Sequence, residues 1–157
     1  MTTCQADHHL SSPEDTAHLA VRLGAHLQPG DCVLLSGGIG AGKSHFARAL
    51  IQSLLVEPED VPSPTFTLVQ TYDTIKGELW HADLYRLGDV DQVIELGLID
   101  AMQSAITLIE WPDRLADVTP DDALQIEIRD PAMDDTRELS LDATDQKWFG
   151  VIKALGK

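Results

Sequence analysis

The residues with the clearest chemical pattern form a glycine-rich octet, 37–44, which reads Gly-Gly-Ile-Gly-Ala-Gly-Lys-Ser. It matches the pattern G-x-x-x-x-G-K-[ST], in which the glycines let successive backbone N–H groups turn toward one phosphate. Lys43 is expected to reach the β- and γ-phosphates of ATP or ADP, and the Ser44 hydroxyl to bind Mg²⁺. An ordinary glycine-rich turn is the alternative. The residues predicted to contact the nucleotide are Gly38, Ile39, Gly40, Ala41, Gly42, Lys43, Ser44, His45 and Trp111.

A second group of candidate residues lies where an apolar strand is predicted to end. The run 105–109, Ala-Ile-Thr-Leu-Ile, is typical of a buried strand, and Glu110 follows it directly. P-loop proteins place a carboxylate near the metal, so Glu110 is predicted to bind Mg²⁺ directly or through water. A surface acid at the strand end is the alternative. Trp111 either lines the nucleotide pocket or caps the core, and the sequence leaves both open.

Two further segments between these motifs carry polar groups that suit phosphate chemistry. Residues 63–67, Ser-Pro-Thr-Phe-Thr, place three hydroxyl groups in a proline-stiffened loop. Such a loop orders around a γ-phosphate and Mg²⁺, or else forms a structural turn. Period-two alternation in a predicted strand puts His81, Asp83 and Tyr85 on one face. Asp83 is a candidate for positioning or deprotonating the attacking water, with an ion pair to Arg86 as the alternative.

The apolar pattern predicts the elements that must hold these residues in place. Ser12 and Pro13 are typical of a helix start, and an apolar stripe at every fourth residue follows them. Residues 32–35 predict a buried strand before the glycine-rich loop, and a second helix begins at Lys43. The other predicted elements are a hairpin of strands 66–72 and 78–85, a helix over 89–103, a strand over 105–109, half-exposed strands over 124–128 and 138–141, and a helix over 143–155. We therefore expect one domain over 1–157 with an α/β, P-loop NTPase-like three-layer fold, whose central sheet is mostly parallel with added antiparallel strands.

The composition is unusual mainly in its charge, because 11 Lys and Arg against 26 Asp and Glu give a net charge of −15. Residues 112–145 hold eleven acids and three arginines, whereas residues 37–55 hold Lys43 and Arg48 and no acid. This balance argues against a large basic face for nucleic acid or anionic lipid but allows a small local anion site. We expect no strong direct binding of nucleic acid.

The sequence shows no features of a membrane or exported protein. No apolar run approaches the roughly 20 residues that span a bilayer, and the first residues lack the basic and apolar regions of a signal peptide. Cys4 and Cys32 form no metal-binding or redox motif and are expected to be reduced thiols. The sequence therefore predicts a cytoplasmic protein without membrane contact.

Together these segments resemble the TsaE family, also called YjeE, whose members are bacterial ATPases needed to make threonylcarbamoyladenosine in tRNA. The resemblance covers residues 12–115. It rests on Pro29-Gly30-Asp31 before the strand, on Gly40 to Ser44, on 63–69 (SPTFTLV), on 81–87 (HADLYRL), on 95–97 (ELG) and on 109–112 (IEWP). This ordered set at these spacings is far more specific than the glycine-rich loop alone.

The resemblance implies a small Mg²⁺-dependent P-loop ATPase with weak activity alone. It implies that TsaC makes the threonylcarbamoyl-adenylate donor and that ATP hydrolysis drives or resets a complex of TsaB and TsaD, through which the protein meets tRNA indirectly. Lys43 matches the phosphate lysine, Ser44 the Mg²⁺ hydroxyl and Glu110 the Mg²⁺-linked glutamate. Thr65 falls in the switch-like loop and Asp83 at the acid important for hydrolysis. With Lys43 and Glu110, these two are the candidate catalytic residues.

Three departures from the usual pattern of this family involve four positions. Gly38 stands where an aspartate is usual, and Ala82 stands where a phenylalanine is usual. The pair Ser44-His45 replaces two threonines. Serine keeps the metal hydroxyl, His45 changes the next contact, and Gly38 removes a carboxylate from the site.

Three other functions are compatible with the phosphate-binding motif. A GTPase usually reads guanine with Asn-Lys-x-Asp, which a chain without asparagine cannot supply. A small-molecule kinase would usually bring arginines to the acceptor, and the six arginines here are isolated in sequence. A nucleotide-bound regulatory module without turnover differs from an ATPase only in whether water is activated, and Gly38 keeps that alternative open.

Overall fold

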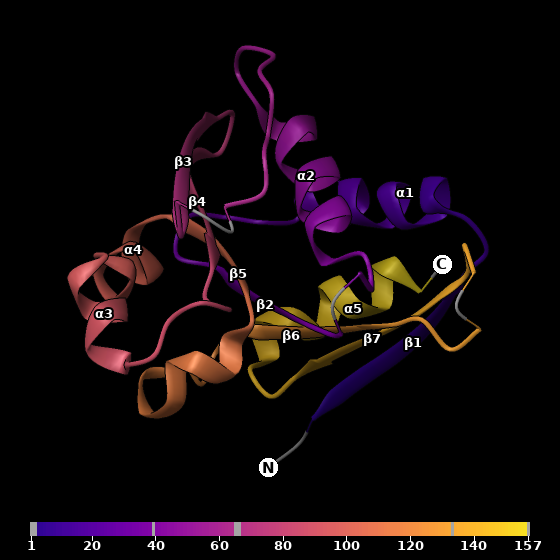
Figure 1. The fold of residues 1–157 in the computed structure, drawn as a ribbon. Coiled ribbons are helices and arrows are strands. Elements are labelled where there is room, and N and C mark those ends of the chain that lie inside the picture. The colour runs from indigo at the N-terminus through magenta and orange to yellow at the C-terminus, as the bar shows by residue number, and fades with distance from the viewer. Residues whose placement is uncertain (1–2, 39, 65–66, 133, 157) are drawn as a thin grey trace.

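The computed structural model is organised around one seven-stranded mixed sheet with the strand order β1-β7-β6-β2-β5-β4-β3 (Figure 1). The structure describes residues 3–38, 40–64, 67–132 and 134–156. The strands are β1 (Cys4–Leu10), β2 (Cys32–Ser36), β3 (Val69–Thr74), β4 (Gly77–Asp83), β5 (Ile106–Glu110), β6 (Leu124–Arg129) and β7 (Arg137–Ala143). β6, β2, β5 and β4 run parallel, whereas β7, β1 and β3 add antiparallel pairs at the two edges. The predicted α/β fold with a mostly parallel centre is confirmed.

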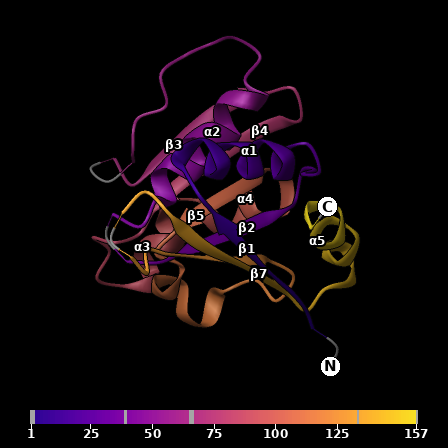
Figure 2. The same ribbon diagram turned by 90° about the vertical axis from the view of Figure 1, so that its right-hand side faces the viewer.

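Helices cover both faces of this sheet. They are α1 (Pro13–Gly24), α2 (Lys43–Leu54), α3 (Val90–Glu95), α4 (Leu98–Ser104) and α5 (Phe149–Leu155), with 3-10 segments η1 (Pro112–Val118) and η2 (Gln146–Trp148). α1 and α2 lie side by side on one face (Figure 2), whereas α3, α4 and η1 pack on the other. The first four residues of β2 are apolar and buried, with Leu35 in the first core and Leu34 in the second. None of the helices in the described ranges is long and apolar enough to cross a membrane.

The two helices beside the glycine-rich loop begin where the sequence predicts. The Ser12 hydroxyl accepts a hydrogen bond from the Asp15 backbone N–H at 3.2 Å, and Pro13 occupies the first turn of α1. α2 begins at Lys43, directly after Gly42, whose φ of +111° is a left-handed conformation that favours glycine. The first turn of α2 therefore follows the loop directly, and its backbone N–H groups have no intrahelical acceptor.

Two predicted helices have different bounds in the structure. The helix predicted over 89–103 is two helices, α3 and α4, because Gly97 between them has a φ of +84°, outside the right-handed helical region. The helix predicted over 143–155 is shorter, since β7 continues to Ala143 and α5 begins at Phe149. In both places the apolar spacing is helical on average, but a local backbone turn interrupts it.

The N-terminal strand β1 was not among the predicted elements. It pairs antiparallel with β7 along its whole length, from Cys4 opposite Ala143 to Leu10 opposite Arg137. Its side chains alternate between half-buried and exposed, but its sequence mixes Cys, Ala and His at the half-buried positions. The strand is therefore stabilised by a distant partner and shows no clear apolar alternation of its own.

The predicted hairpin is present with small changes in its bounds. Its first strand, β3, begins at Val69 instead of residue 66, and residues 65–66 lie outside the described part of the chain. β4 ends at Asp83, so Tyr85 lies beyond the strand on which the sequence placed it. The structure thus carries Asp83 at the very end of a strand, next to the loops of the candidate site.

Candidate nucleotide-binding site

The glycine-rich loop leaves the carboxyl end of β2, between its parallel neighbours β5 and β6. Gly37 has a φ of +143°, and a Cβ built there would lie 2.3 Å from the Ile128 carbonyl oxygen. Only glycine allows the chain to turn so close to the backbone of β6. The first glycine of the motif therefore sets the direction in which the loop leaves the sheet.

Lys43 is the cation of the loop, and its ammonium group is turned inward. Its Nζ donates hydrogen bonds to the carbonyl oxygens of Gly37 at 2.7 Å and Gly38 at 2.9 Å, and lies 4.3 Å from the ring centroid of Trp111. Burial lowers the pKa of Lys43, and the nearby carboxylates of Glu110 and Asp83 act in the opposite direction. The structure thus holds one largely buried positive charge at the loop, stabilised by carbonyl oxygens and an aromatic face.

Glu110 and Ser44 come together at the base of the loop. Parallel pairing of β2 with β5 sets Leu35 opposite Glu110, so the glutamate ends its strand directly beside the P-loop strand. The Ser44 hydroxyl donates to the Glu110 carboxylate, with distances of 3.0 Å to Oε1 and 3.3 Å to Oε2. Glu110 is only 2% exposed, so the alternative of a surface acid at a strand end is wrong.

The oxygen atoms of Ser44 and Glu110 are the kind of donors that Mg²⁺ prefers. In the described part of the chain no group of three or more His, Cys, Asp or Glu side chains is arranged to hold a metal. A site of one hydroxyl and one carboxylate is nevertheless the usual arrangement for Mg²⁺ that also binds phosphate oxygens and water. The residues present therefore fit a nucleotide-dependent Mg²⁺ site and do not form an all-protein metal cage.

Asp83, Tyr85 and Trp111 complete a cavity of about 300 Å³ beside the loop. Asp83 is 5% exposed, and its Oδ1 accepts a hydrogen bond from the Tyr85 backbone N–H at 3.0 Å. The Tyr85 and Trp111 rings pack with centroids 4.8 Å apart. Trp111 has a left-handed φ of +58°, and it lines this cavity as well as packing against the core on the η1 side. Both sequence interpretations of Trp111 therefore describe part of its environment.

A second cavity of about 300 Å³ lies against the same loop. It shares Gly40, Gly42 and His45 with the first cavity. Its other lining residues are Pro13, Thr16, Asp135 and Arg137. The His45 Nε2 is 2.9 Å from the Pro13 carbonyl oxygen, which joins the first turns of α1 and α2. His45 therefore makes a contact between helices beside the loop.

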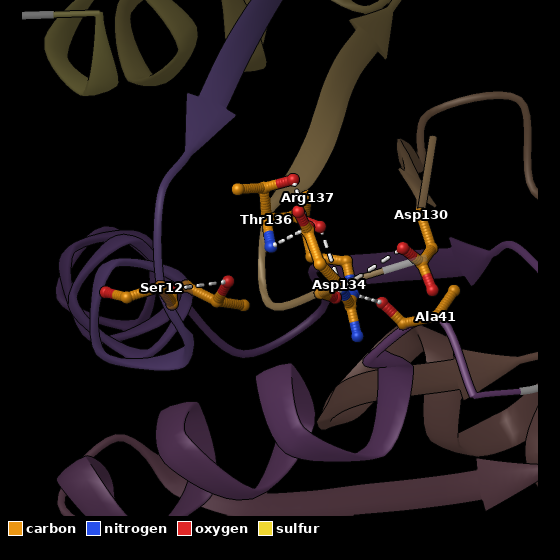
Figure 3. A network of polar contacts seen from close by, with 7 residues as sticks. Ser12, Ala41, Asp130, Asp134, Thr136 and Arg137 are labelled. Atoms are coloured by element: carbon orange, nitrogen blue, oxygen red, sulfur yellow. Dashed lines mark hydrogen bonds and ion pairs between the residues drawn. The ribbon is translucent and has the colours of Figure 1, made fainter. Parts of the chain in front are cut away.

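Arg137 fastens the glycine-rich loop to the turn between β6 and β7 (Figure 3). Its Nε donates to the Ala41 carbonyl oxygen at 2.8 Å, while Nη1 donates to the carbonyl oxygens of Thr136 at 2.7 Å and of Asp134. Nη1 also lies 3.4 Å from the Asp130 carboxylate. No sequence pattern indicates this contact, because Arg137 is isolated and lies 96 residues from Ala41.

The structure brings most of the sequence-predicted site residues together. Those that line the first cavity are Gly40, Gly42, Lys43, Ser44, His45, Asp83, Glu110 and Trp111. Ala41 is held by Arg137, and Gly38 accepts a hydrogen bond from Lys43 through its carbonyl oxygen. Ile39 and Thr65 lie outside the described residues, so their predicted roles stay predictions.

The fold and the loop define a class of protein. A parallel strand that leads through G-x-x-x-x-G-K-S into a helix, with a buried glutamate ending the neighbouring strand, is the arrangement of a P-loop NTPase-like protein. The family model described as "Threonylcarbamoyl adenosine biosynthesis protein TsaE" matches residues 10–139. The chain belongs to the TsaE family.

Known relatives match along most of their own length. The protein TsaE of Aquifex aeolicus is 43% identical over 122 residues, 77% of this chain and 86% of the relative. TsaE of Rickettsia bellii is 37% identical over 130 residues, 83% of this chain and 89% of the relative. The crystal structure of YdiB from Bacillus subtilis superposes with a TM-score of 0.79 at 27% identity, covering 99% of this chain and 97% of that one. The similarity therefore includes the sheet edges as well as the loop.

Proposed function

We propose that this protein is an Mg²⁺-dependent ATPase of tRNA threonylcarbamoyladenosine biosynthesis. The observation that carries the proposal is the contact between the Ser44 hydroxyl and the buried Glu110 carboxylate at 3.0 Å, at the residue that follows the inward-turned Lys43. Lys43, Ser44 and Glu110 line one cavity, and we assign them the roles of phosphate-binding lysine, metal hydroxyl and metal-linked carboxylate. The names of the relatives, tRNA threonylcarbamoyladenosine biosynthesis proteins, support the pathway.

In this proposal each polar group of the cavity has one role in hydrolysis. Lys43 leaves the loop carbonyls and binds β- and γ-phosphate oxygens, while Ser44 and Glu110 hold Mg²⁺ directly or through water. When bound by these residues, the metal would neutralise charge on the phosphate oxygens. Asp83, whose Oδ1 is fixed by a backbone N–H, orients the water and accepts its proton as the water oxygen bonds to the γ-phosphorus. The bond from that phosphorus to the β-bridging oxygen breaks, giving ADP and phosphate.

The second cavity suits the nucleoside half of the same ligand. In this proposal the triphosphate follows the backbone N–H groups from Lys43 toward His45, at the first turn of α2. His45 lines both cavities, so a sugar and base that continue past it would enter the space lined by Pro13 and Arg137. ATP and ADP are therefore the proposed ligands, with Gly38, Ile39 and Trp111 among their contacts.

The proposed partners are TsaB and TsaD, whose complex ATP hydrolysis would drive or reset in the cytoplasm. Direct, strong binding of tRNA by this chain alone is not expected, because the net charge is −15 and residues 37–55 carry only Lys43 and Arg48 as cations. Contact with tRNA is proposed to be indirect, through the complex. Tight, salt-sensitive tRNA binding by the isolated protein would contradict this part of the proposal.

Phosphate release from ATP by the purified protein, alone and with TsaB and TsaD, tests the proposal. We expect weak release alone and stimulation by the two partners. Lys43→Ala should abolish nucleotide binding, and Asp83→Ala and Glu110→Ala should remove stimulated hydrolysis. Arg129→Ala, at an exposed ion pair with Glu127, is the matched control and should behave as wild type. Unchanged ATP binding in Lys43→Ala would overturn the phosphate site.

Gly38 keeps a regulatory module without turnover as a second candidate. It removes the carboxylate that is usual at this position, and a Cβ built there would meet no described atom within 4 Å. An aspartate side chain therefore fits the backbone at position 38. If the protein binds ATP but releases no phosphate with its partners present, and Gly38→Asp gains hydrolysis, the regulatory interpretation is the correct one.

A further inference from the structure

We propose that His81 is the positioning residue for Glu110, holding one carboxylate oxygen so that the other faces Ser44 and Mg²⁺. The inference rests on the proposed function, because it assigns a residue to the metal site of that same cavity. His81 does not line the cavity, and neither the glycine-rich loop nor the metal ligands include it. It would act only through Glu110.

The sheet places the two side chains together in the interior. β4 and β5 run parallel, with Asp83 opposite Glu110 and His81 opposite Leu108. Because side chains alternate along a strand, His81 lies on the same face of β4 as Asp83, two residues further from the loop. The His81 Nε2 is 2.6 Å from Oε2 of Glu110, and the two side chains are 1% and 2% exposed. The contact is therefore short and closed to bulk water.

The hydrogen-bond pattern defines which ring nitrogen donates. A carboxylate can only accept, so the short contact requires a proton on Nε2 of His81. The Nδ1 of His81 is buried and has no hydrogen-bond partner among the described residues. The structure therefore assigns the donated proton to Nε2, the ring nitrogen that faces Glu110.

The two oxygens of Glu110 consequently have different tasks. Oε2 is held by His81 at 2.6 Å, whereas the shorter contact of Ser44, at 3.0 Å, is to Oε1. When the Ser44 hydroxyl turns to a metal, the hydrogen bond from His81 still fixes the rotation of the carboxylate. Residues that orient a metal ligand in this way typically change metal affinity about 10- to 100-fold when they are replaced.

Two substitutions of His81 separate donation from packing. His81→Phe keeps a flat ring of similar size but removes the donor, whereas His81→Gln retains an N–H at a similar distance from the backbone. Leu79→Val is the matched control, because Leu79 is also fully buried in β4 on the same face. If His81→Phe does not fold, nitrogen-15 NMR of the wild-type imidazole still tests the contact.

The measurement is the affinity for ADP, first in EDTA and then across a Mg²⁺ titration. We expect all variants to bind ADP alike in EDTA. The Mg²⁺ concentration that gives half of the affinity gain should rise about 10- to 100-fold in His81→Phe and by less than about threefold in His81→Gln and Leu79→Val. An unchanged Mg²⁺ midpoint in His81→Phe overturns the positioning role and leaves the proposed function intact. If Mg²⁺ does not affect ADP binding by the wild type, the metal role of Glu110 fails first.

A readout without any ligand tests the same contact. Nitrogen-15 NMR of the imidazole in the nucleotide-free protein is expected to show a proton on Nε2 of His81. Its absence would overturn the proposal whatever the binding data show.

Discussion

Replacing Arg137 is the most informative perturbation of the site, because this side chain holds the loop without lining the cavity that contains Ser44 and Glu110. Its hydrogen bond to the Ala41 carbonyl oxygen is 2.8 Å long, and Ala41 is 4% exposed. A hydrogen bond from a charged donor contributes about 1.5–3 kcal/mol, and the half-exposed ion pair with Asp130 adds about 0–1 kcal/mol. The remaining bonds lie within the turn and contribute less. Arg137→Ala should therefore lower the free energy of unfolding by about 2–3 kcal/mol.

Two assays measure the consequence. A loss of this size in a chain of 157 residues corresponds to a fall in Tm of roughly 5–10 °C by thermal denaturation. Since the lost bond holds the loop itself, we expect ADP affinity to fall about tenfold, which corresponds to about 1.4 kcal/mol. Arg137→Lys keeps the charge but not the planar guanidinium. Its Tm and ADP affinity should lie between those of the wild type and those of Arg137→Ala.

Arg129→Ala is the matched control for this experiment. Arg129 lies in the same β6–β7 hairpin, is 44% exposed and pairs with Glu127 without touching the loop. Its replacement should change stability by less than about 0.5 kcal/mol and leave ADP affinity unchanged. If both alanine variants show the same Tm and the same ADP affinity, the argument that Arg137 fastens the loop is refuted.

Three further outcomes follow from the same geometry. Gly37→Ala should abolish nucleotide binding, because its Cβ would lie 2.3 Å from the Ile128 carbonyl oxygen. Gly38→Ala should bind nucleotide normally, and ADP titrations compare the two variants. Because burial lowers the pKa of Lys43 and only the charged amine binds phosphate, ADP affinity should fall as pH rises through a midpoint below the usual lysine value of 10.5. Lys43→Arg should remove that pH dependence, since arginine stays charged. Burial raises the pKa of Cys32 to about 12, so mass spectrometry should find it unalkylated at pH 8 until the protein is denatured, while the other cysteine reacts.

The part of the site that could be predicted from the sequence is the part formed by consecutive residues. The glycine-rich loop follows an apolar strand and precedes a helix, so its position needed no knowledge of distant contacts. Glu110 was predicted for a similar reason, since an apolar run that ends in an acid places that acid at a strand end. The pairing of β5 with β2 then brings the Glu110 carboxylate into contact with Ser44.

The features that the sequence did not indicate depend on long-range pairing or a single backbone angle. β1 forms only because β7 supplies a partner, and the same pairing places Arg137 opposite Leu10 near the start of α1. The break between α3 and α4 follows from the positive φ of Gly97. Apolar periodicity over a whole segment does not reveal a single backbone angle of this kind. His81 was placed on the correct strand face, but its short contact with Glu110 required the register of β4 against β5.

The net charge of −15 and a site for a polyanion are compatible because the acids near the loop are few and engaged. Glu110 accepts hydrogen bonds from Ser44 and His81, and one oxygen of Asp83 accepts a backbone N–H. These two carboxylates are the ones to which the proposed function assigns metal binding and water activation. At physiological ionic strength, charges beyond about 8 Å across solvent are largely screened, so the acids elsewhere on the surface have little effect on the loop. What the cavity binds is therefore decided by the partners of its own two acids and by one buried lysine. The total charge bears mainly on which macromolecules the rest of the surface repels.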